Sequence, residues 1–435
     1  MNTDPREMID KAPMSLLQIF IIAITVGLNA MDGIDVLSIA LAMPDIAEQW
    51  QLSDWIVGFL LNMELIGMGI GSMALGWVSD ATGRRKTIIG CLIMMAVGMF
   101  MVARSGGAVE LSIWRIITGL GIGGLLAAIT AITAEFSNLK NRALCISIMA
   151  IGYPIGGIFQ SKIAGWLLHT YGDWQLIFYF GAAVTCFFIP LFYFVVPESV
   201  HWLVRKQPEG ALDKVNKTLK RIGHGAIAVL PEVTTEVRKK SYSDLFSPSL
   251  IRITTIITVA YFLQISTYYF ILKWVPKVIV NFGMGDSSVG AEMLMYANIG
   301  GMLGGIVLGL LTLRFSVKLL TIGTLAFSAV FITILGNATD LSFFAVFAAL
   351  SGFFGNAGII GMYALFPPAF PTHVRASGTG FVIGIGRGGA YLGPVIVGLM
   401  FNQGLSLPTV TMLISIGALI GAIVLVFLKL KKNTV

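Results

Sequence analysis

Long apolar runs separated by short polar stretches fill almost the whole chain. Most of them reach or exceed the roughly 20 apolar residues that a helix needs to cross the hydrocarbon core of a bilayer. We therefore expect an all-α membrane protein. The twelve predicted spans are residues 14–43, 55–79, 87–104, 111–134, 143–168, 174–196, 251–276, 288–313, 317–336, 341–366, 376–401 and 407–428.

One long polar stretch, residues 197–248, interrupts the series after the sixth span. We expect this stretch, which includes LDKVNKTLKRIG, to form one or two amphipathic helices. The chain then divides into a six-helix bundle at 1–196, this linker, and a second six-helix bundle at 249–435. The segment GWVSDATGRRK after span 2 has an eroded counterpart, GLLTLRFSVK, after span 8. Paired six-span repeats are typical of transporters with a central site.

Composition agrees with this picture. Of the 435 residues, 56% are hydrophobic and only 12% are charged, whereas soluble domains carry roughly 25% charged residues. A soluble enzyme, a nucleic-acid-binding protein and a secreted scaffold are thereby disfavoured. The three cysteines lie in apolar runs, and the four histidines have no metal-like spacing. We expect no disulfide, no metal and no cofactor.

The charges indicate an orientation. Lys and Arg number 29 against 22 Asp and Glu, which gives a net charge of +7. If both termini and the linker are cytoplasmic, most basic residues fall on the cytoplasmic side, as the positive-inside rule requires. The excess charge then marks one membrane face, and no nucleic-acid partner is needed. The N-terminus lacks the features of a secretory signal. We expect a multi-pass protein of the cell inner membrane.

Two acids lie deep in span 1. Asp32 and Asp35 are three residues apart and so share one helix face, and each charge costs ~2.5–3.5 kcal/mol near mid-bilayer. Two close carboxylates differ in proton affinity, so one of them can hold a proton near neutrality. A proton-coupled carrier needs such a group. The alternative is that one of them is a packing acid neutralised by Arg115.

Other charges also fall within spans. Glu64 in span 2 is either a third proton site or the partner of a nearby base. Arg387 in span 11 is too deep to reach the interface, and its planar guanidinium suits a carboxylate. The four glycines around it are expected to clear space for it, and an ion pair between helices is the alternative. Lys162 either lines the cavity or snorkels, and Lys273 is expected at the interface.

The string GxxxDxxGRRK at residues 76–86 resembles the loop signature of the major facilitator superfamily. The twelve spans, the six-plus-six repeat and the central linker fit that fold. The resemblance implies a charge cluster that closes the cytoplasmic side and can be made in one state and broken in another. The alternative is that the basic residues only set topology. The implied gating residues are Asp80, Gly83, Arg84, Arg85, Glu135 and Arg142.

The segment Asp32-Gly33-Ile34-Asp35 resembles the DGxD signature of the aromatic acid:proton symporter family within that superfamily. Residues 273–276, KWVP, and the Gly-Arg-Gly-Gly stretch at 386–389 resemble two further segments of that family. The resemblance implies that Arg115 pairs with Asp35 or Asp32 and responds to protonation. Snorkelling is the alternative for Arg115. The candidate proton-coupling residues are therefore Asp32, Asp35, Arg115 and Glu64, of which Glu64 is not expected from the family.

We therefore predict a transporter and not an enzyme: a proton-coupled symporter that imports a small organic acid by alternating access, with protons and the bilayer as its other partners. The expected state is a monomer. The aromatic nature of the substrate rests on the resemblance, since each tyrosine singly is more often a packing residue. The candidate substrate-binding residues are Arg387, Asn29, Tyr268, Gln264, Tyr391 and Lys162.

Three other functions fit the sequence less well. A proton-coupled drug or metabolite exporter often carries Gly-Pro-x-x-Gly-Gly in span 5, but Tyr153-Pro154-Ile155-Gly156-Gly157 has a different spacing. A sugar porter is less favoured because span 7 offers Gln264 rather than paired glutamines. A membrane enzyme or sensor lacks the expected catalytic cluster or large soluble domain. Benzoate, hydroxybenzoates, phenylpropanoids, nicotinate-like acids and non-aromatic diacids all fit one Arg with several tyrosines.

Overall fold

The computed structural model describes residues 4–231, 245–248, 250–312, 314–370 and 374–428, and these are helices and their connections. Residues 232–244 of the predicted linker lie outside the described part. Within these described residues, twelve helical segments are long and apolar enough to cross a membrane, one of them formed by α3 and α4 together, which confirms the predicted fold class. The spanning helices are α2 (Leu16–Gln49), α3 (Asp54–Leu60), α4 (Met63–Thr82), α5 (Arg84–Ala103), α6 (Ala108–Glu135), α7 (Arg142–Tyr171), α8 (Gln175–Val195), α11 (Ile251–Asn281), α12 (Ser287–Leu311), α13 (Val317–Leu335), α14 (Leu341–Ala369), α15 (Arg375–Asn402) and α16 (Leu407–Val426).

The helices pack into two compact units that do not follow a single cut of the chain. Unit 1 consists of Met1–Val36, Ile66–Gly156 and Gln175–Val237, and unit 2 consists of Leu37–Leu65, Gly157–Trp174 and Arg238–Val435. Helices α2 and α7 therefore begin in unit 1 and end in unit 2. The predicted blocks 1–196 and 249–435 divide the sequence by repeat, whereas these units divide the chain by packing.

Small residues let the helix backbones of unit 1 approach closely. A Cβ atom on Gly67 of α4 would lie 2.1 Å from the carbonyl oxygen of Ile116 of α6, and one on Gly123 would lie 2.2 Å from that of Met68. A Cβ on Gly156 of α7 would lie 2.0 Å from the carbonyl oxygen of Ala30 of α2. Helices in a membrane associate mainly by such close contacts, because lipid provides no hydrophobic drive between them.

Glycines also let the helix backbones of unit 2 approach closely. On α12 and α14, a Cβ on Gly300 would lie 1.9 Å from the carbonyl oxygen of Ala349, and one on Gly352 would lie 1.9 Å from that of Ala297. On α15, Gly389 and Gly393 leave no room for a side chain against α11: their Cβ atoms would each lie 2.5 Å from an α11 carbonyl oxygen. Helices α11, α12, α14 and α15 are thus closely packed.

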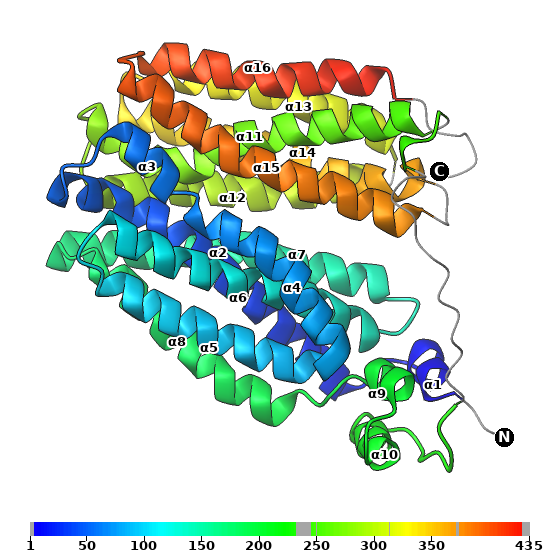
Figure 1. Ribbon diagram of the computed structural model, residues 1–435. Helices are drawn as coiled ribbons and strands as arrows, with labels where there is room; N and C mark the ends of the chain where they lie inside the picture. The colour runs from blue at the N-terminus through cyan, green and yellow to red at the C-terminus, as the bar shows by residue number, and fades with distance from the viewer. Residues whose placement is uncertain (1–3, 232–244, 249, 313, 371–373, 429–435) are drawn as a thin grey trace. The chain divides into compact units, whose positions relative to one another are not determined.

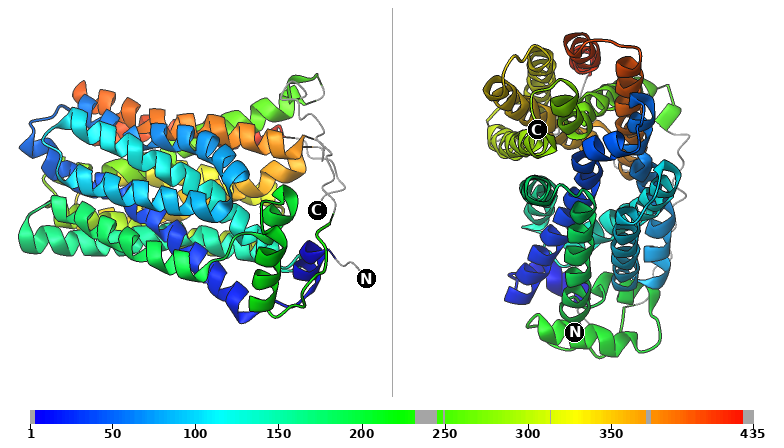
Figure 2. Two further views of the ribbon diagram at one scale, coloured as in Figure 1. Left: turned by 60° about the horizontal axis from the view of Figure 1, so that its bottom comes forward. Right: turned by 90° about the vertical axis from the view of Figure 1, so that its left-hand side faces the viewer.

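Three short helices form a separate small core in unit 1. They are α1 (Pro5–Lys11), α9 (Val200–Lys206) and α10 (Ala211–Arg221), and α9 and α10 belong to the predicted linker. Figure 1 shows them together, and Figure 2 (left) shows them from a second direction. Their buried side chains are Ile9, Val200, Trp202, Leu203, Val204, Val215, Leu219 and Ile222. This apolar core ties the start of the chain to the linker.

The glycine contacts lead to a prediction for the Gly300→Ala variant. The added methyl group has to push α12 away from the backbone of α14, so we expect a loss of about 1–3 kcal/mol in unfolding free energy. Gly309→Ala, on the same helix, is the control because nothing lies within 4 Å of its Cβ position. Thermal unfolding in detergent measures both variants. Equal midpoints for the two would contradict the packing role of Gly300.

Candidate functional site

A fully buried ion pair joins α2 and α6 within unit 1. Arg115 Nη1 lies 2.6 Å from Asp35 Oδ1, and Arg115 Nη2 donates to the backbone oxygen of Asp35 at 3.2 Å. The exposure of the two side chains is 0% and 1%. The Phe178 ring lies 5.9 Å from the guanidinium carbon. Arg115 therefore does not snorkel to a membrane surface, and it pairs with Asp35.

Asp32 lies one turn before Asp35 on α2 and is 4% exposed. Both acids are thus withdrawn from water in the first spanning helix. Asn29, one turn earlier, is also buried, and its Nδ2 donates to the backbone oxygen of Met149 at 2.9 Å. Asn29 therefore holds α2 against α7.

A second fully buried ion pair joins α4 and α11 within unit 2. It connects Glu64 Oε1 with Lys273 Nζ, and both side chains are 0% exposed. Of the two interpretations of Glu64, the structure shows the ion pair. The expectation that Lys273 lies at the interface is wrong, because its ammonium group is enclosed with this carboxylate. The sequence offered no signal for the pairing, since the two residues are 209 positions apart.

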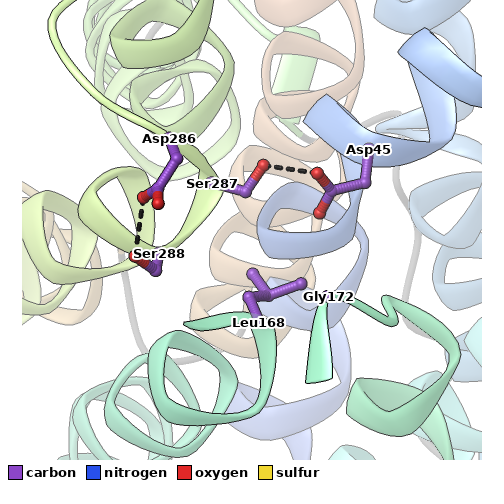
Figure 3. A pocket seen from close by; sticks show the side chains of 6 residues that line it. All are labelled: Asp45, Leu168, Gly172, Asp286, Ser287 and Ser288. Carbon is purple, nitrogen blue, oxygen red and sulfur yellow. Dashed lines mark hydrogen bonds between the residues drawn. The ribbon is translucent and has the colours of Figure 1, made fainter. Parts of the chain in front are cut away.

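Unit 2 contains further contacts between its helices. A Cβ on Gly398 of α15 would lie 2.6 Å from the Asp54 carbonyl oxygen of α3, and Trp274 Nε1 donates to the Pro394 carbonyl oxygen at 3.0 Å. Ser287 Oγ, at the start of α12, donates to Asp45 Oδ1 of α2 at 2.6 Å, beside a small pocket (Figure 3). Residues 37–65 and 157–174 from the first six spans are thus packed with the second six.

A cluster of charged residues forms in unit 1 where α4 ends and α5 begins. Asp80 pairs with Arg84 and with Arg205, each at 2.8 Å, and Arg84 Nη2 lies 3.5 Å from Glu135 Oε1. Arg84 is buried although it is charged. Arg142 pairs instead with Asp10 of α1, and the Arg85 guanidinium donates to the Tyr193 backbone oxygen. Five of the implied gating residues thus contribute charges to this face of unit 1.

The sixth, Gly83, is required by its backbone. Its φ of +110° is a conformation that side chains rarely adopt, and a Cβ there would lie 2.3 Å from Glu198 Oε2. Glu198 Oε1 accepts from the backbone N–H of Arg84 at 3.0 Å and of Arg85 at 3.3 Å. The carboxylate therefore caps the N-terminus of α5, where a negative charge is favourable.

Glu198 and Arg205 are functional candidates that the sequence interpretation missed. Glu198 stands directly after span 6, and Arg205 reads as one more basic residue of the linker. Their partners, Arg84 and Asp80, are more than a hundred positions away. A distant carboxylate opposite a Gly-Arg-Arg turn is visible only when the chain is folded.

Arg387 lies on α15 and is partly exposed. Gly398 is 11 residues further along, about three turns, so both point to the same side of the helix. Because Gly398 contacts α3, Arg387 faces the side of unit 2 on which segments of the first six spans pack. Among the residues that the structure describes, no carboxylate lies within ion-pair distance of its guanidinium. It is a cation available to an anion.

Two of the four glycines around Arg387 have a different role from the expected one. A Cβ on Gly386 would lie 2.0 Å from Tyr261 Cε1, and Gly389 contacts Phe262 and Ser266 of α11. These glycines fit α15 against α11. Gly384, with nothing within 4 Å, and Gly388, whose nearest neighbour is at 3.7 Å, are the two that leave space.

The remaining substrate candidates lie in different surroundings. Gln264 is fully buried and its Nε2 donates to the Gly355 backbone oxygen at 3.0 Å. Tyr268 is 6% exposed and packs against Gly355 of α14. Tyr391 is partly exposed, and Lys162 is exposed. Gln264 and Tyr268 thus fill the contact of α11 with α14.

Comparison with known proteins gives one answer for the whole chain. The profile of the Major Facilitator Superfamily matches residues 20–316. The gallate transporter of Pseudomonas putida is 26% identical over 97% of this chain and 94% of its own length. The benzoate transport protein of Acinetobacter baylyi is 26% identical over 97% and 91%. The inward-open structure of the Escherichia coli xylose transporter, 17% identical, superposes with a TM-score of 0.72 over 96% of this chain and 98% of that one, which shows the shared fold.

The buried pair Glu64–Lys273 leads to a prediction on stability. Glu64→Gln removes the carboxylate but leaves the Lys273 charge buried, so we expect a loss of about 3–5 kcal/mol in unfolding free energy. The double variant Glu64→Met with Lys273→Met removes both charges and should recover most of that loss. Unfolding in detergent measures both, with the exposed Glu292→Gln as the control. A double variant as unstable as the single one would count against the pairing.

A second prediction concerns Glu198, which lies outside the spanning helices. Burial raises its pKa above the ordinary 4.5, although the backbone donors of Ser199, Arg85 and Arg84 and the Arg84 charge oppose the shift. The folded state thus holds the proton more tightly than the unfolded state, and ionisation costs stability as the pH rises above 4.5. Glu198→Gln lacks this ionisation. We expect its melting temperature to rise relative to that of wild type as the pH increases.

The increase should level off once the pH exceeds the raised pKa of Glu198. The exposed linker variant Glu209→Gln is the matched control and should show no such trend. A difference between Glu198→Gln and wild type that stays constant from pH 4 to pH 8, or that falls, would exclude this role for Glu198.

Proposed function

The chain belongs to the Major Facilitator Superfamily, and from this premise we propose that it is a proton-coupled symporter that imports a small aromatic carboxylate. Members of this family are transporters, so the chain is a multi-pass membrane transporter and not an enzyme. The proposal concerns the substrate, the proton and the direction of transport. The observation that carries it is the similarity along nearly the whole chain to proteins named for gallate and for benzoate.

Arg387 supports a carboxylate substrate. Gallate and benzoate share a carboxylate attached directly to an aromatic ring, so a site common to both has to hold that group. A guanidinium offers two parallel N–H donors that match a carboxylate. Arg387 has this geometry and no carboxylate partner among the described residues. We therefore assign it as the substrate anchor.

The Asp35–Arg115 pair supports proton coupling. An ionised aspartate in this buried pair is stabilised by the guanidinium 2.6 Å away. Protonation of Asp35 would remove that attraction and leave the arginine charge in a buried site, which is costly. Protonation of Asp35 therefore favours a rearrangement of helices α2 and α6. Proton binding at Asp35, with Asp32 one turn away, would in this way change the relative free energies of two conformations.

The contacts within unit 2 suggest which face is closed. We propose the orientation with both termini on the cytoplasmic side of the inner membrane. The ends of α2, α3, α4 and α7 that pack with the second six spans then lie toward the outside. The Glu64–Lys273 pair and the Asp45–Ser287 hydrogen bond would hold that side closed. Substrate entry requires these contacts to separate as the six-helix halves 1–196 and 249–435 move.

The test is uptake of labelled benzoate and gallate into proteoliposomes. We expect uptake to increase when the outer solution is made acidic and to stop when a protonophore collapses the gradient. If a broad panel of aromatic acids gives no gradient-driven uptake, the proposed function is wrong. A thermal-shift screen of the purified protein against the same panel narrows the choice of substrate.

The Asp35→Asn variant tests the coupling itself. Asparagine cannot bind or release a proton in this range, so gradient-driven accumulation should fall to background. Exchange of labelled for unlabelled substrate needs no net proton movement and should remain measurable. Asp213→Asn, an exposed acid on α10, is the control and should transport normally. Full accumulation by Asp35→Asn would rule out Asp35 as the coupling group.

A further inference from the structure

Two tyrosines of unit 2 share a hydrogen bond. Tyr261 of α11 and Tyr363 of α14 have their hydroxyl oxygens 2.9 Å apart. Tyr261 is 1% exposed, whereas Tyr363 is 44% exposed. The Phe366 ring meets both rings edge-on, with centroids 5.2 and 5.7 Å away. A buried phenol is thus held in place while its partner remains open on one side.

The hydrogen bond between the two hydroxyl groups uses only one of their two hydrogens. Each phenol is both a donor and an acceptor. If Tyr261 donates to Tyr363, the Tyr363 hydrogen is free to donate outward, and among the described residues neither hydroxyl has another partner. A chain of hydrogen bonds of this kind polarises its last donor. The open end of the pair is therefore a donor suited to an anion.

The direction of Tyr363 follows from helix geometry. Gly361, two residues earlier on α14, contacts Thr321 of α13. Two residues turn a helix by about 200°, so Tyr363 points away from α13. Asn356, seven residues earlier and on nearly the same face, donates to the Gly301 backbone oxygen of α12 at 2.8 Å. Tyr363 thus extends from the side of α14 that meets α11 and α12.

Arg387 lies beside this pair. The preceding residue, Gly386, contacts the Tyr261 ring so closely that a Cβ there would lie 2.0 Å from Cε1. The positive charge of Arg387 also interacts electrostatically with the Tyr261 phenol. Three elements, α11, α14 and α15, therefore bring two hydroxyls and one guanidinium to the same part of unit 2, and the glycine contacts of α15 with α11 fix their spacing.

We propose that Tyr363 is a substrate-binding residue that donates its hydroxyl hydrogen to the carboxylate held by Arg387, and that Tyr261 positions it. The inference rests on the proposed function, because it assigns a third donor to the carboxylate of that substrate. Two guanidinium N–H groups and one phenol O–H then surround the anion. The pair selects for the acid group and is indifferent to hydroxyl groups on the ring.

Binding of benzoate and of gallate to purified full-length protein, measured by calorimetry, tests this assignment. Tyr363→Phe should weaken both acids by about tenfold or more, as expected for a hydrogen bond to a charged group. Tyr261→Phe keeps Tyr363 but releases it, and should weaken both acids by a smaller factor. Tyr296→Phe is the control, because the Tyr296 hydroxyl bonds Glu292 at 2.9 Å on an exposed face of α12.

The outcomes separate this inference from the function it rests on. If wild type binds neither benzoate nor gallate nor any other aromatic acid, the proposed function fails, and this inference fails with it. If wild type binds and Tyr363→Phe binds equally well, only the inference fails. A loss confined to gallate would overturn it too, since the pair would then recognise a ring hydroxyl. Should Tyr363→Phe unfold, Tyr261→Phe decides: its affinity for both acids must fall.

Discussion

A charge inside a bundle of membrane-spanning helices has to be paired, because neither lipid nor the packed interior can solvate it. This constraint organises the charged residues of the spans. Asp35 and Arg115 satisfy it in unit 1, and Glu64 and Lys273 satisfy it in unit 2. Arg387 is different, because the described residues offer it no carboxylate. Among the described residues, Arg115 and Lys273 have protein anions, and Arg387 is the cation to which the proposed function assigns an anion from outside.

Close backbone contacts make the position of that cation definite. Glycines of α15 rest on α11, and glycines of α12 and α14 rest on each other. A helix held by contacts along its backbone cannot rotate without breaking several of them at once. Arg387, Tyr261 and Tyr363 are therefore presented by closely packed elements, and the proposed ligand would meet a preformed arrangement of donors instead of having to order one.

The sequence predicted the parts of this arrangement that are visible along the chain. The apolar runs predict the twelve spans, and the charges within them indicate Asp32, Asp35, Arg115 and Arg387 as candidate functional residues. Partners distant in sequence are not visible along the chain: the sequence predicts Lys273 at the interface, whereas it is buried with Glu64, and no pattern indicates that Glu198 caps the Gly83-Arg84 turn. The sequence predicts open space at Gly386 and Gly389 because it does not show that α11 lies against them. The sequence gives no sign that Tyr261 lies at the candidate site, because a tyrosine in an apolar run is usually a packing residue.

Three of the five points at which the chain passes between the two compact units lie inside helices. In α2 the crossing falls between Val36 and Leu37, one residue after Asp35, and in α4 it falls between Leu65 and Ile66, one residue after Glu64. In α7 it falls between Gly156 and Gly157, two residues after Pro154, where the helix lacks a backbone hydrogen bond. As the six-helix halves 1–196 and 249–435 move in the proposed cycle, the ends of these three helices that belong to unit 2 have to leave it, so the crossings are the mechanical joints. A proton that binds at Asp35 then acts on a joint directly, and no relay of side chains has to carry its effect to a distant pivot.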